Sequence, residues 1–491
     1  MPTLEVPSSE RPDPGSRSHS GTPLHLKDFV HDLIVKRRNE KNSEAHQIFR
    51  SYPGHAPKGM PQTVNPDEET VPGIQHPGST GVIYCTDRAM ANGFVYGNPE
   101  LGSCGTGQGA PEVGDIPDAP VRPQTVSLPH DSLEYAPTTG VKELRKAVAD
   151  LYNHTYRQGK KSQYTHENVC IVPGGRAGLS RVAAVVGDVY CGYQVPEYTT
   201  YSEVLSVFKR LVPIPTALTP ESRYKIDINQ AKHDISGQGL QVIVASNPRN
   251  PTGQVVAGDE LKELVDLSKH HCTVVLDEFY SWYIYNDEGE QTGKSISGAA
   301  YVDGWRVCWV VGPKNLISAL SQSGSFLDGG ANHPLQLAAI PFLDPAHVEK
   351  EKLALQKHFR MKRDHVLKRL EEIGLPVAIP PQATFYIWLD LRALPAPLND
   401  GLTFFEELLK EKTIVVPGIF FEINPAHRRD LFSSPCHHFV RISFGPPLED
   451  LDKGLNAIDR VMRRAKKEGM NGIGVDLIKS PIEGHFPGTN H

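Results

Sequence analysis

The stretch from Gln241 to Tyr280 constrains this chain most, because it joins two short apolar runs through an amphipathic helix. The first run, Val242–Ala245, ends in Asn-Pro-Arg-Asn-Pro-Thr-Gly, and the second, Val274–Leu276, ends in Asp277. Between them, apolar residues recur at the spacing of one helix face. Two such runs joined by a helix predict a βαβ unit within a buried parallel sheet.

Three polar side chains follow the predicted strand ends, namely Asn250, Asp277 and Tyr280. In sheets of this kind, ligands bind in the crevice beyond the carboxyl ends of the strands. For either motif alone, a turn or a polar strand end is the favoured interpretation. Their order and spacing together favour a binding site.

The segments SNPRNPTG and LDEFY resemble those of the class I/II aminotransferases, the aspartate-aminotransferase-like family that uses pyridoxal 5′-phosphate. The resemblance implies that Asn250 and Tyr280 form hydrogen bonds with the hydroxyl of the pyridine ring. It also implies that Tyr280 is a catalytic residue. Asp277 would pair with the ring nitrogen, whose proton keeps the cofactor an electron sink. It also implies the PLP-transferase fold type I: α/β, with a mostly parallel central sheet, helices on both faces and a smaller α+β domain.

A glycine turn offers a place for the cofactor phosphate. The segment NVCIVPGGRAGLS leads from a short apolar strand into a turn that opens a helix, where free N–H groups and the helix dipole favour an anion. The resemblance assigns the phosphate to Gly175, Arg176 and Ala177. The GKS/T ending of a nucleotide-binding loop is missing.

Two tyrosines complete the implied cofactor site. In QVPEYTTY, Tyr198 takes the place of the aromatic residue that stacks on the ring, with Tyr201 as the alternative. Tyr135, in LEYAPTTG, would reach the phosphate of the neighbouring subunit, which implies a homodimer. A surface tyrosine before a helix explains Tyr135 equally well.

The segment after Tyr280 departs from the family pattern. There a lysine that binds the cofactor covalently ends a Ser-x-Ser-Lys motif, and a Gly-x-Arg follows. Here Gly-Trp-Arg ends in Arg306, a match for the phosphate-binding arginine, but aligning Ser295-Ile296-Ser297 puts Gly298 at the lysine position. Two interpretations stay open: Lys294 supplies the amine from a rearranged loop, or the lysine-bearing strand is missing from this chain.

The motif set closes with HHFVRISFG, in which Arg441 lies on a predicted strand. The resemblance implies that Arg441 binds the substrate α-carboxylate, because a guanidinium forks onto a carboxylate with two parallel bonds. His437 and His438 have no further ligand at a suitable spacing, so we expect no metal site.

Length and composition indicate the domain organisation, the classes of partner and the cellular location. We expect a disordered start, a short helix and a Pro/Gly-rich arm in residues 1–80, a large cofactor-binding domain at 81–345, a small domain at 346–470 and a tail at 471–491. The formal charge is −6, and neither a Lys/Arg block nor an apolar run of membrane-spanning length occurs. We therefore expect no nucleic-acid or membrane partner. Seven scattered cysteines indicate reduced thiols and a cytoplasmic location.

The expected activity is amino-group transfer between an amino acid and a 2-oxo acid. The segments GGRAGL, SNPRNPTG and GSFLDGG also resemble those of aminotransferases of filamentous-fungal secondary metabolism, such as alkaloid pathways of the swainsonine type. Fold alone does not decide the reaction. The alternatives are a lyase, an oxidative or decarboxylating enzyme, or an inactive protein of the same fold in which the lysine-bearing segment is shortened.

Overall fold

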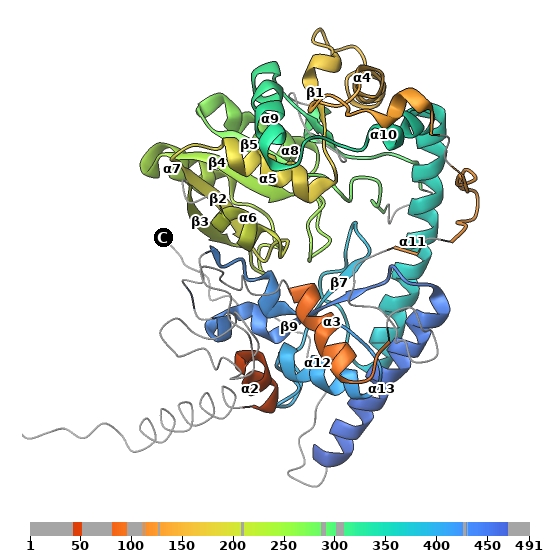
Figure 1. Cartoon of the computed structure of the whole chain (residues 1–491). Helices are drawn as coiled ribbons and strands as arrows, with labels where there is room; N and C mark the ends of the chain where they lie inside the picture. Colours follow the sequence, from red (N-terminus) through yellow and green to blue (C-terminus); the bar gives the residue numbers. More distant parts are fainter. Residues whose placement is uncertain are drawn as a thin grey trace, which may run out of the picture.

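A computed structural model describes residues 43–51, 81–95, 111–112, 114–125, 128–207, 211–285, 291–300, 309–425, 429 and 431–469. Figure 1 shows two halves joined along one side by the long helix α11 (Pro345–Ile373). Of the predicted N-terminal region, only α2 (Glu44–Ser51) and its neighbour Ser43 are described. The rest of residues 1–80 and the tail at 471–491 lie outside the described residues.

The large domain is built on a four-stranded sheet in the order β3-β2-β4-β5, in which all neighbours are parallel. Its strands are β2 (Tyr190–Val195), β3 (Val212–Ala217), β4 (Leu240–Ser246) and β5 (Thr273–Asp277). Most residues of β4 and the last three of β5 are buried. Such continuous burial is expected of parallel strands that helices cover on both faces.

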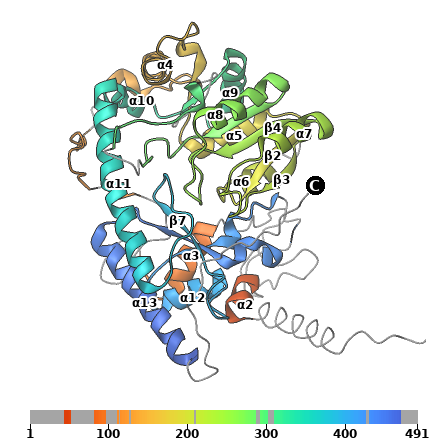
Figure 2. The ribbon, with the colours of Figure 1, turned by 180° about the vertical axis from the view of Figure 1, so that it is seen from behind.

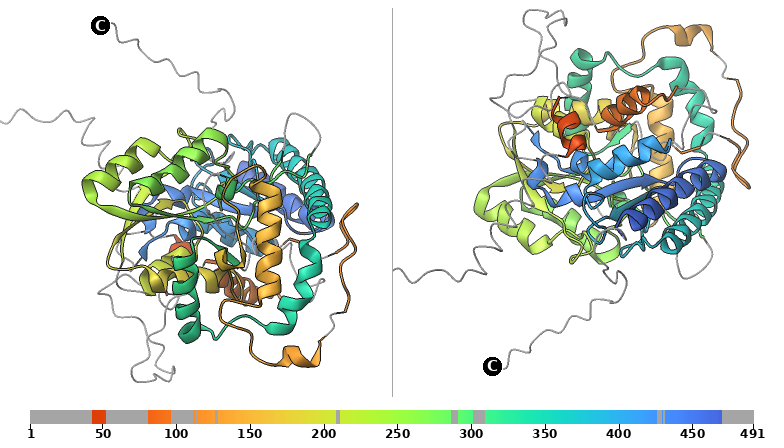
Figure 3. Two further views of the ribbon diagram at one scale, coloured as in Figure 1. Left: turned by 90° about the horizontal axis from the view of Figure 1, so that it is seen from above. Right: turned by 90° about the horizontal axis from the view of Figure 1, so that it is seen from below.

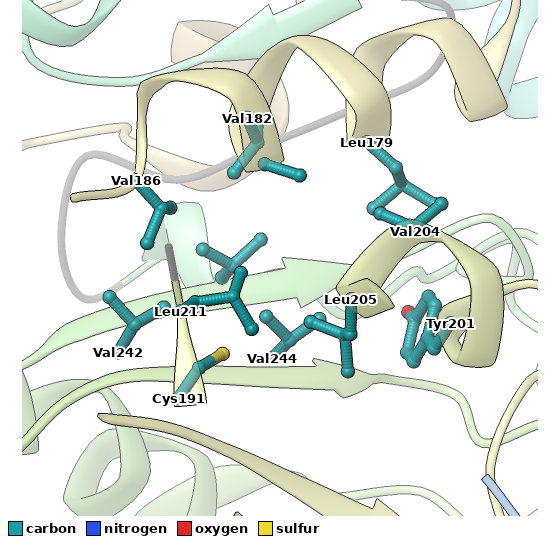
Figure 4. A pocket seen from close by; sticks show the side chains of 12 residues that line it. Leu179, Val182, Val186, Cys191, Tyr201, Val204, Leu205, Leu211, Val242 and Val244 are labelled. Carbon is teal, nitrogen blue, oxygen red and sulfur yellow. The ribbon is translucent and has the colours of Figure 1, made fainter. Parts of the chain in front are cut away.

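Helices do cover both faces of this sheet, as predicted. Val244 and Val275 face an apolar cavity beneath α5 (Gly175–Val185) and α6 (Tyr201–Val207), which Figure 4 shows from close by. Leu276, the next residue on β5, lies on the opposite face, where it and Val265 of α8 (Gly258–Asp266) border Gly298. Successive side chains of a strand point to opposite faces, so the two helix layers follow from the alternation.

The large domain also holds a second, two-stranded sheet. Its strands β1 (Val169–Ile171) and β6 (Trp309–Val311) are antiparallel. Within the described part of the chain, β5 pairs only with β4, and β6 only with β1. The short 3-10 turn η4 (Gly298–Ala300) lies between them: Gly298 borders β5, and Ala299 packs in the same core as β1 and β6.

The small domain holds an antiparallel sheet in the order β7-β9-β8. Its elements are β7 (Tyr386–Asp390), β8 (Val416–Pro417), β9 (Phe439–Ser443), α12 (Gly401–Lys410) and α13 (Leu448–Gly469). Seen from behind, α3 (Gly81–Ala91) also lies in this half (Figure 2), and Tyr84 of α3 packs against Phe420. Residues 81–91 therefore pack with the small domain, although the sequence assigns them to the large one. The view from below shows α2 there as well (Figure 3).

The remaining helices complete the large domain. They are α4 (Lys142–Tyr156), α7 (Ile228–Gln238), α9 (Lys314–Leu327) and α10 (His333–Ala339). The short 3-10 turns are η1 (His130–Leu133), η2 (His166–Asn168), η3 (Leu267–His270), η5 (Ile340–Leu343), η6 (Gly418–Phe421), η8 (Leu431–Ser433) and η9 (Pro435–His438). Among the helices described, none is both long and apolar enough to cross a membrane.

Sequence signals set both ends of α11, the helix that joins the domains. At its start, the Asp344 carboxylate accepts hydrogen bonds from the backbone N–H groups of Ala346 and His347, and Pro345 occupies the first turn. At its end, Gly374 adopts a φ of 92°, which other residues rarely reach.

Candidate active site

The parallel register of β4 and β5 brings the predicted polar residues to one edge. Ser246 and Asp277 are Cα partners at the ends of the two strands, and the Asn247 N–H donates to the Asp277 carbonyl at 2.8 Å. The βαβ unit predicted from Gln241 to Tyr280 is therefore confirmed. The turn after β4 is closed by the Asn247 side chain, which bonds both backbone groups of Val256 at 2.9 Å.

Asn250, Tyr280 and Arg441 lie together at this edge, with Tyr386 as a fourth member. The Arg441 Nη1 donates to the Asn250 Oδ1 at 3.0 Å, and the Asn250 Nδ2 lies 3.5 Å from the Tyr280 hydroxyl. The Tyr280 and Tyr386 hydroxyls are 3.0 Å apart. The Arg441 guanidinium carbon lies 4.0 Å from the centre of the Tyr386 ring, which closes the ring of contacts.

All four of these side chains are buried, and burial is the main cause that raises the pKa of the Tyr280 and Tyr386 phenols. Both hydroxyls are therefore neutral across the physiological range and can donate as well as accept. Asp277 is 6% exposed, and its Oδ1 accepts a bond from the Phe279 N–H at 3.3 Å.

The glycine turn and Tyr198 meet on a neighbouring part of the same edge. Gly174 precedes α5 with a φ of 100°, and a side chain built on it would meet open space. Arg176, in the first turn of α5, donates from Nε to the Tyr198 hydroxyl at 3.1 Å. Gly175 and Ala177 flank Arg176 at the helix start. Tyr201 instead lines the apolar cavity beneath α5 (Figure 4).

A buried carboxylate that the sequence analysis did not single out ties these strand ends together. Glu197 is fully buried and accepts bonds from the Ser246 N–H at 3.1 Å and the Tyr198 N–H at 3.0 Å. Burial raises the pKa of Glu197, and the Arg249 guanidinium 3.6 Å away opposes that rise. Glu197 belongs to no recognised motif. Its position between Pro196 and Tyr198 is the only sequence signal that could have indicated a role at the site.

The segment that carries the lysine in the family pattern is packed differently here. Lys294 is exposed, and its carbonyl accepts a bond from Gln356 of α11 at 2.7 Å. Gly298, at the aligned lysine position, is buried and donates its N–H to Glu278 at 2.7 Å. A Cβ at Gly298 would lie 2.9 Å from the Leu276 Cδ1, so the Leu276 side chain would have to shift to admit any larger residue there.

Of the two other predicted residues, one lies apart from this cluster and one is not described. Tyr135 follows η1 and is 97% exposed, so within one chain it touches none of the residues above. Arg306 lies outside the described residues. His437 and His438 bond the carbonyl oxygens of Ser434 and Asn399, and the described residues hold no cluster suited to a metal ion.

The family can now be assigned. The model of the aminotransferase class I and II family matches residues 107–458. This chain belongs to that family. It is a pyridoxal-phosphate-dependent aminotransferase, and its family moves an amino group between an amino acid and a 2-oxo acid.

Relatives and solved structures agree with this assignment. The aspartate/prephenate aminotransferase of Thermus thermophilus is 27% identical over 355 residues, which are 69% of this chain and 86% of that protein. The LL-diaminopimelate aminotransferase of Dehalococcoides mccartyi is 28% identical over 343 residues, 65% of this chain and 81% of that one. The solved aspartate aminotransferase of Thermus thermophilus with maleate has a TM-score of 0.61 at 22% identity, covering 78% and 97% of the two chains. These likenesses confirm the fold type I architecture.

The packing around Gly298 predicts a pH dependence of stability. Burial raises the pKa of Glu278 to about 8, although Ser297 and the Gly298 N–H favour its charged form. The native state therefore keeps a proton that the unfolded chain releases above its ordinary pKa of about 4.5. This contribution to stability is complete below that value and is lost as the pH rises toward 8, by at most about 1.4 kcal/mol per pH unit.

Glu278→Gln removes the ionisation and keeps the shape of the side chain. We expect chemical unfolding between pH 5.5 and 8.5 to show a smaller loss of stability for this variant than for the unaltered protein. Glu263→Gln, an exposed change on α8, serves as the control and should follow the unaltered protein. Parallel curves for all three proteins would contradict the assignment.

Proposed function

We propose that the crevice beyond β4 and β5 holds pyridoxal phosphate and an amino acid for amino-group transfer. The observation that carries the proposal is the convergence of Asn250, Tyr280 and Arg441 beside Asp277, at the end of two register-matched parallel strands. An acid, an amide and a phenol suit the ring of the cofactor. A glycine turn with open space suits its phosphate.

Each residue has a distinct task in this proposal. Asp277 holds the proton on the ring nitrogen, because a neighbouring carboxylate favours the charged form of that nitrogen. Asn250 and Tyr280 bond the ring hydroxyl, and Tyr198 lies against the ring face. The N–H groups of Gly175, Arg176 and Ala177, together with the Arg306 side chain, hold the phosphate. The bound cofactor acts as an electron sink for the Cα–H bond.

Arg441 binds the substrate carboxylate in this proposal. Its guanidinium lies between the rings of Tyr386, at 4.0 Å, and Phe421, at 4.9 Å from the ring centres. Contacts with two aromatic rings, together with the bond from Nη1 to Asn250, restrict the movement of the guanidinium. Arg441 is therefore oriented before the substrate binds.

We further propose that the strand bearing the covalent lysine is missing from this chain between β5 and β6. Three observations support this: Lys294 is exposed, a side chain at Gly298 would crowd Leu276, and β5 and β6 have no second partner strand among the described residues. The cofactor would then be held by non-covalent contacts alone. The same packing favours a second candidate function, a cofactor-binding protein of this fold without turnover.

An exposed apolar surface supports a homodimer. Tyr135, Leu133, Phe326 and Leu335 are all exposed at η1, the end of α9 and α10. The η1 and α10 segments adjoin, because the His333 ring nitrogen lies 3.0 Å from the Glu134 carbonyl. We propose that this surface meets a second copy, in which Tyr135 of one subunit reaches the phosphate site of the other.

We also propose a cytoplasmic enzyme of fungal amino-acid-derived secondary metabolism, such as an alkaloid pathway. The pathway is supported by the resemblance of the segments GGRAGL, SNPRNPTG and GSFLDGG to those of aminotransferases from fungal secondary metabolism. The support for the location is that the five cysteines of the described residues are all free and buried.

Asp277→Asn tests the cofactor site, because it keeps the shape of the side chain and removes the charge. We expect weaker binding of pyridoxal phosphate, measured by fluorescence titration, and any transaminase activity to fall on the order of 10²-fold or more. Asp266→Asn, at the half-buried last residue of α8, should bind the cofactor as the unaltered protein does. Unchanged binding and turnover in Asp277→Asn would refute the site.

Borohydride reduction tests the origin of the amine. The protein is mixed with equimolar pyridoxal phosphate, reduced, digested and mapped by mass spectrometry. We expect Lys294 to be labelled no more than Lys269, an exposed lysine on η3, because neither amine faces the crevice. Stoichiometric labelling of Lys294 would show that this residue supplies the amine and that no strand is missing.

The dimer is tested by light scattering coupled to size-exclusion chromatography. The double variant Leu133→Glu, Leu335→Glu places charges in the proposed interface, so we expect it to run as a monomer while the unaltered protein runs as a dimer. Val121→Glu, at an exposed site beside α11, is the control. A monomeric unaltered protein, or a dimeric double variant, would contradict the proposed interface.

A further inference from the structure

Tyr386 closes the ring of four side chains at the site, and no motif in the sequence points to it. It is the first residue of β7, in a stretch whose alternating pattern predicts a strand and nothing more. Its ring lies under the Arg441 guanidinium, and its hydroxyl lies 3.0 Å from that of Tyr280. Like Asn250, it contacts both Tyr280, which is proposed to bind the cofactor ring, and Arg441, which is proposed to bind the carboxylate; unlike Asn250, it carries no role in the family pattern.

The ring of contacts spans the two domains twice. Asn250 and Tyr280 follow the ends of β4 and β5 in the large domain, whereas Tyr386 and Arg441 belong to β7 and β9 of the small domain. One crossing is the Arg441–Asn250 bond, and the other is the Tyr280–Tyr386 pair, both at 3.0 Å. Two separate crossings restrict rotation of one domain against the other more than one bond does.

Either hydroxyl of the tyrosine pair can donate the hydrogen bond, and only one of the two directions leaves the Tyr280 hydrogen for a ligand. The Tyr280 oxygen has two lone pairs, and Asn250 Nδ2 can donate to one of them at 3.5 Å. If the Tyr386 hydroxyl donates to the other, the Tyr280 hydrogen is left to point at a ligand. The Tyr386 oxygen then needs no further donor from Tyr280.

We propose that Tyr386 is a positioning residue that holds Tyr280 as a hydrogen-bond donor toward the cofactor and holds Arg441 in the plane that receives the carboxylate. This inference rests on the proposed function. Because its two contacts reach opposite ends of the site, Tyr386 keeps the cofactor ring and the substrate carboxylate in register.

Tyr386→Phe separates the two contacts, because it keeps the ring under Arg441 and removes only the hydroxyl. We expect the Kd for pyridoxal phosphate, from fluorescence titration of the full-length protein, to rise about 3- to 10-fold, as for one lost hydrogen bond. Tyr193→Phe is the matched control. Tyr193 is also buried and also bonds across the domains, to the Ile423 carbonyl at 3.1 Å, so its variant should bind the cofactor normally.

A double-mutant cycle distinguishes positioning from a purely structural role. If Tyr386 acts through Tyr280, the Tyr280→Phe, Tyr386→Phe double variant should bind the cofactor no more weakly than Tyr280→Phe alone. A structural role would lower the melting temperature of Tyr386→Phe without changing its Kd, or would multiply the two effects, and either result overturns the inference. Failure of the unaltered protein to bind pyridoxal phosphate would instead refute the proposed function itself.

Discussion

The parallel pairing of β4 with β5 is the constraint on which the rest of this molecule depends. Its register places Ser246 beside Asp277, so the turn after one strand and the acid at the end of the other share an edge. Asn250 then reaches Arg441 of the small domain, and that bond joins the two halves where the ligand is proposed to bind. Glu197, buried below, ties the end of β2 to the same edge.

The sequence predicts most of this arrangement because its signals are local. A polar residue after a strand end is recognisable from its immediate neighbours in the sequence. Asn250, Asp277, Tyr280 and the glycine turn before α5 could therefore be proposed from the sequence. Arg441 was found through its place in the motif series. Tyr386 was not, because its partners lie 106 residues away at Tyr280 and 55 away at Arg441, and its own neighbours indicate only a strand.

Long-range packing also explains the misplaced domain boundary. Helix α3 precedes the large domain in the chain, so sequence order assigns it there. Its apolar residues instead pack against Phe420 and Phe405, in the small domain. Glu278 is a similar case: it directly follows Asp277, yet it bonds Ser297 and Gly298 across a turn whose course the sequence does not reveal.

The residues proposed to bind the cofactor ring follow the family pattern, whereas the region between β5 and β6, where the family carries its lysine, departs from it. The acid, amide and phenol are in place, while the aligned lysine position is a buried glycine against Leu276. A crystal structure of the protein soaked with pyridoxal phosphate would test the proposed position of the cofactor most directly. The account predicts the ring nitrogen within hydrogen-bond distance of the Asp277 carboxylate and the phosphate at the Gly174–Ala177 turn. Cofactor density elsewhere, or a ring turned away from Asp277, would contradict it.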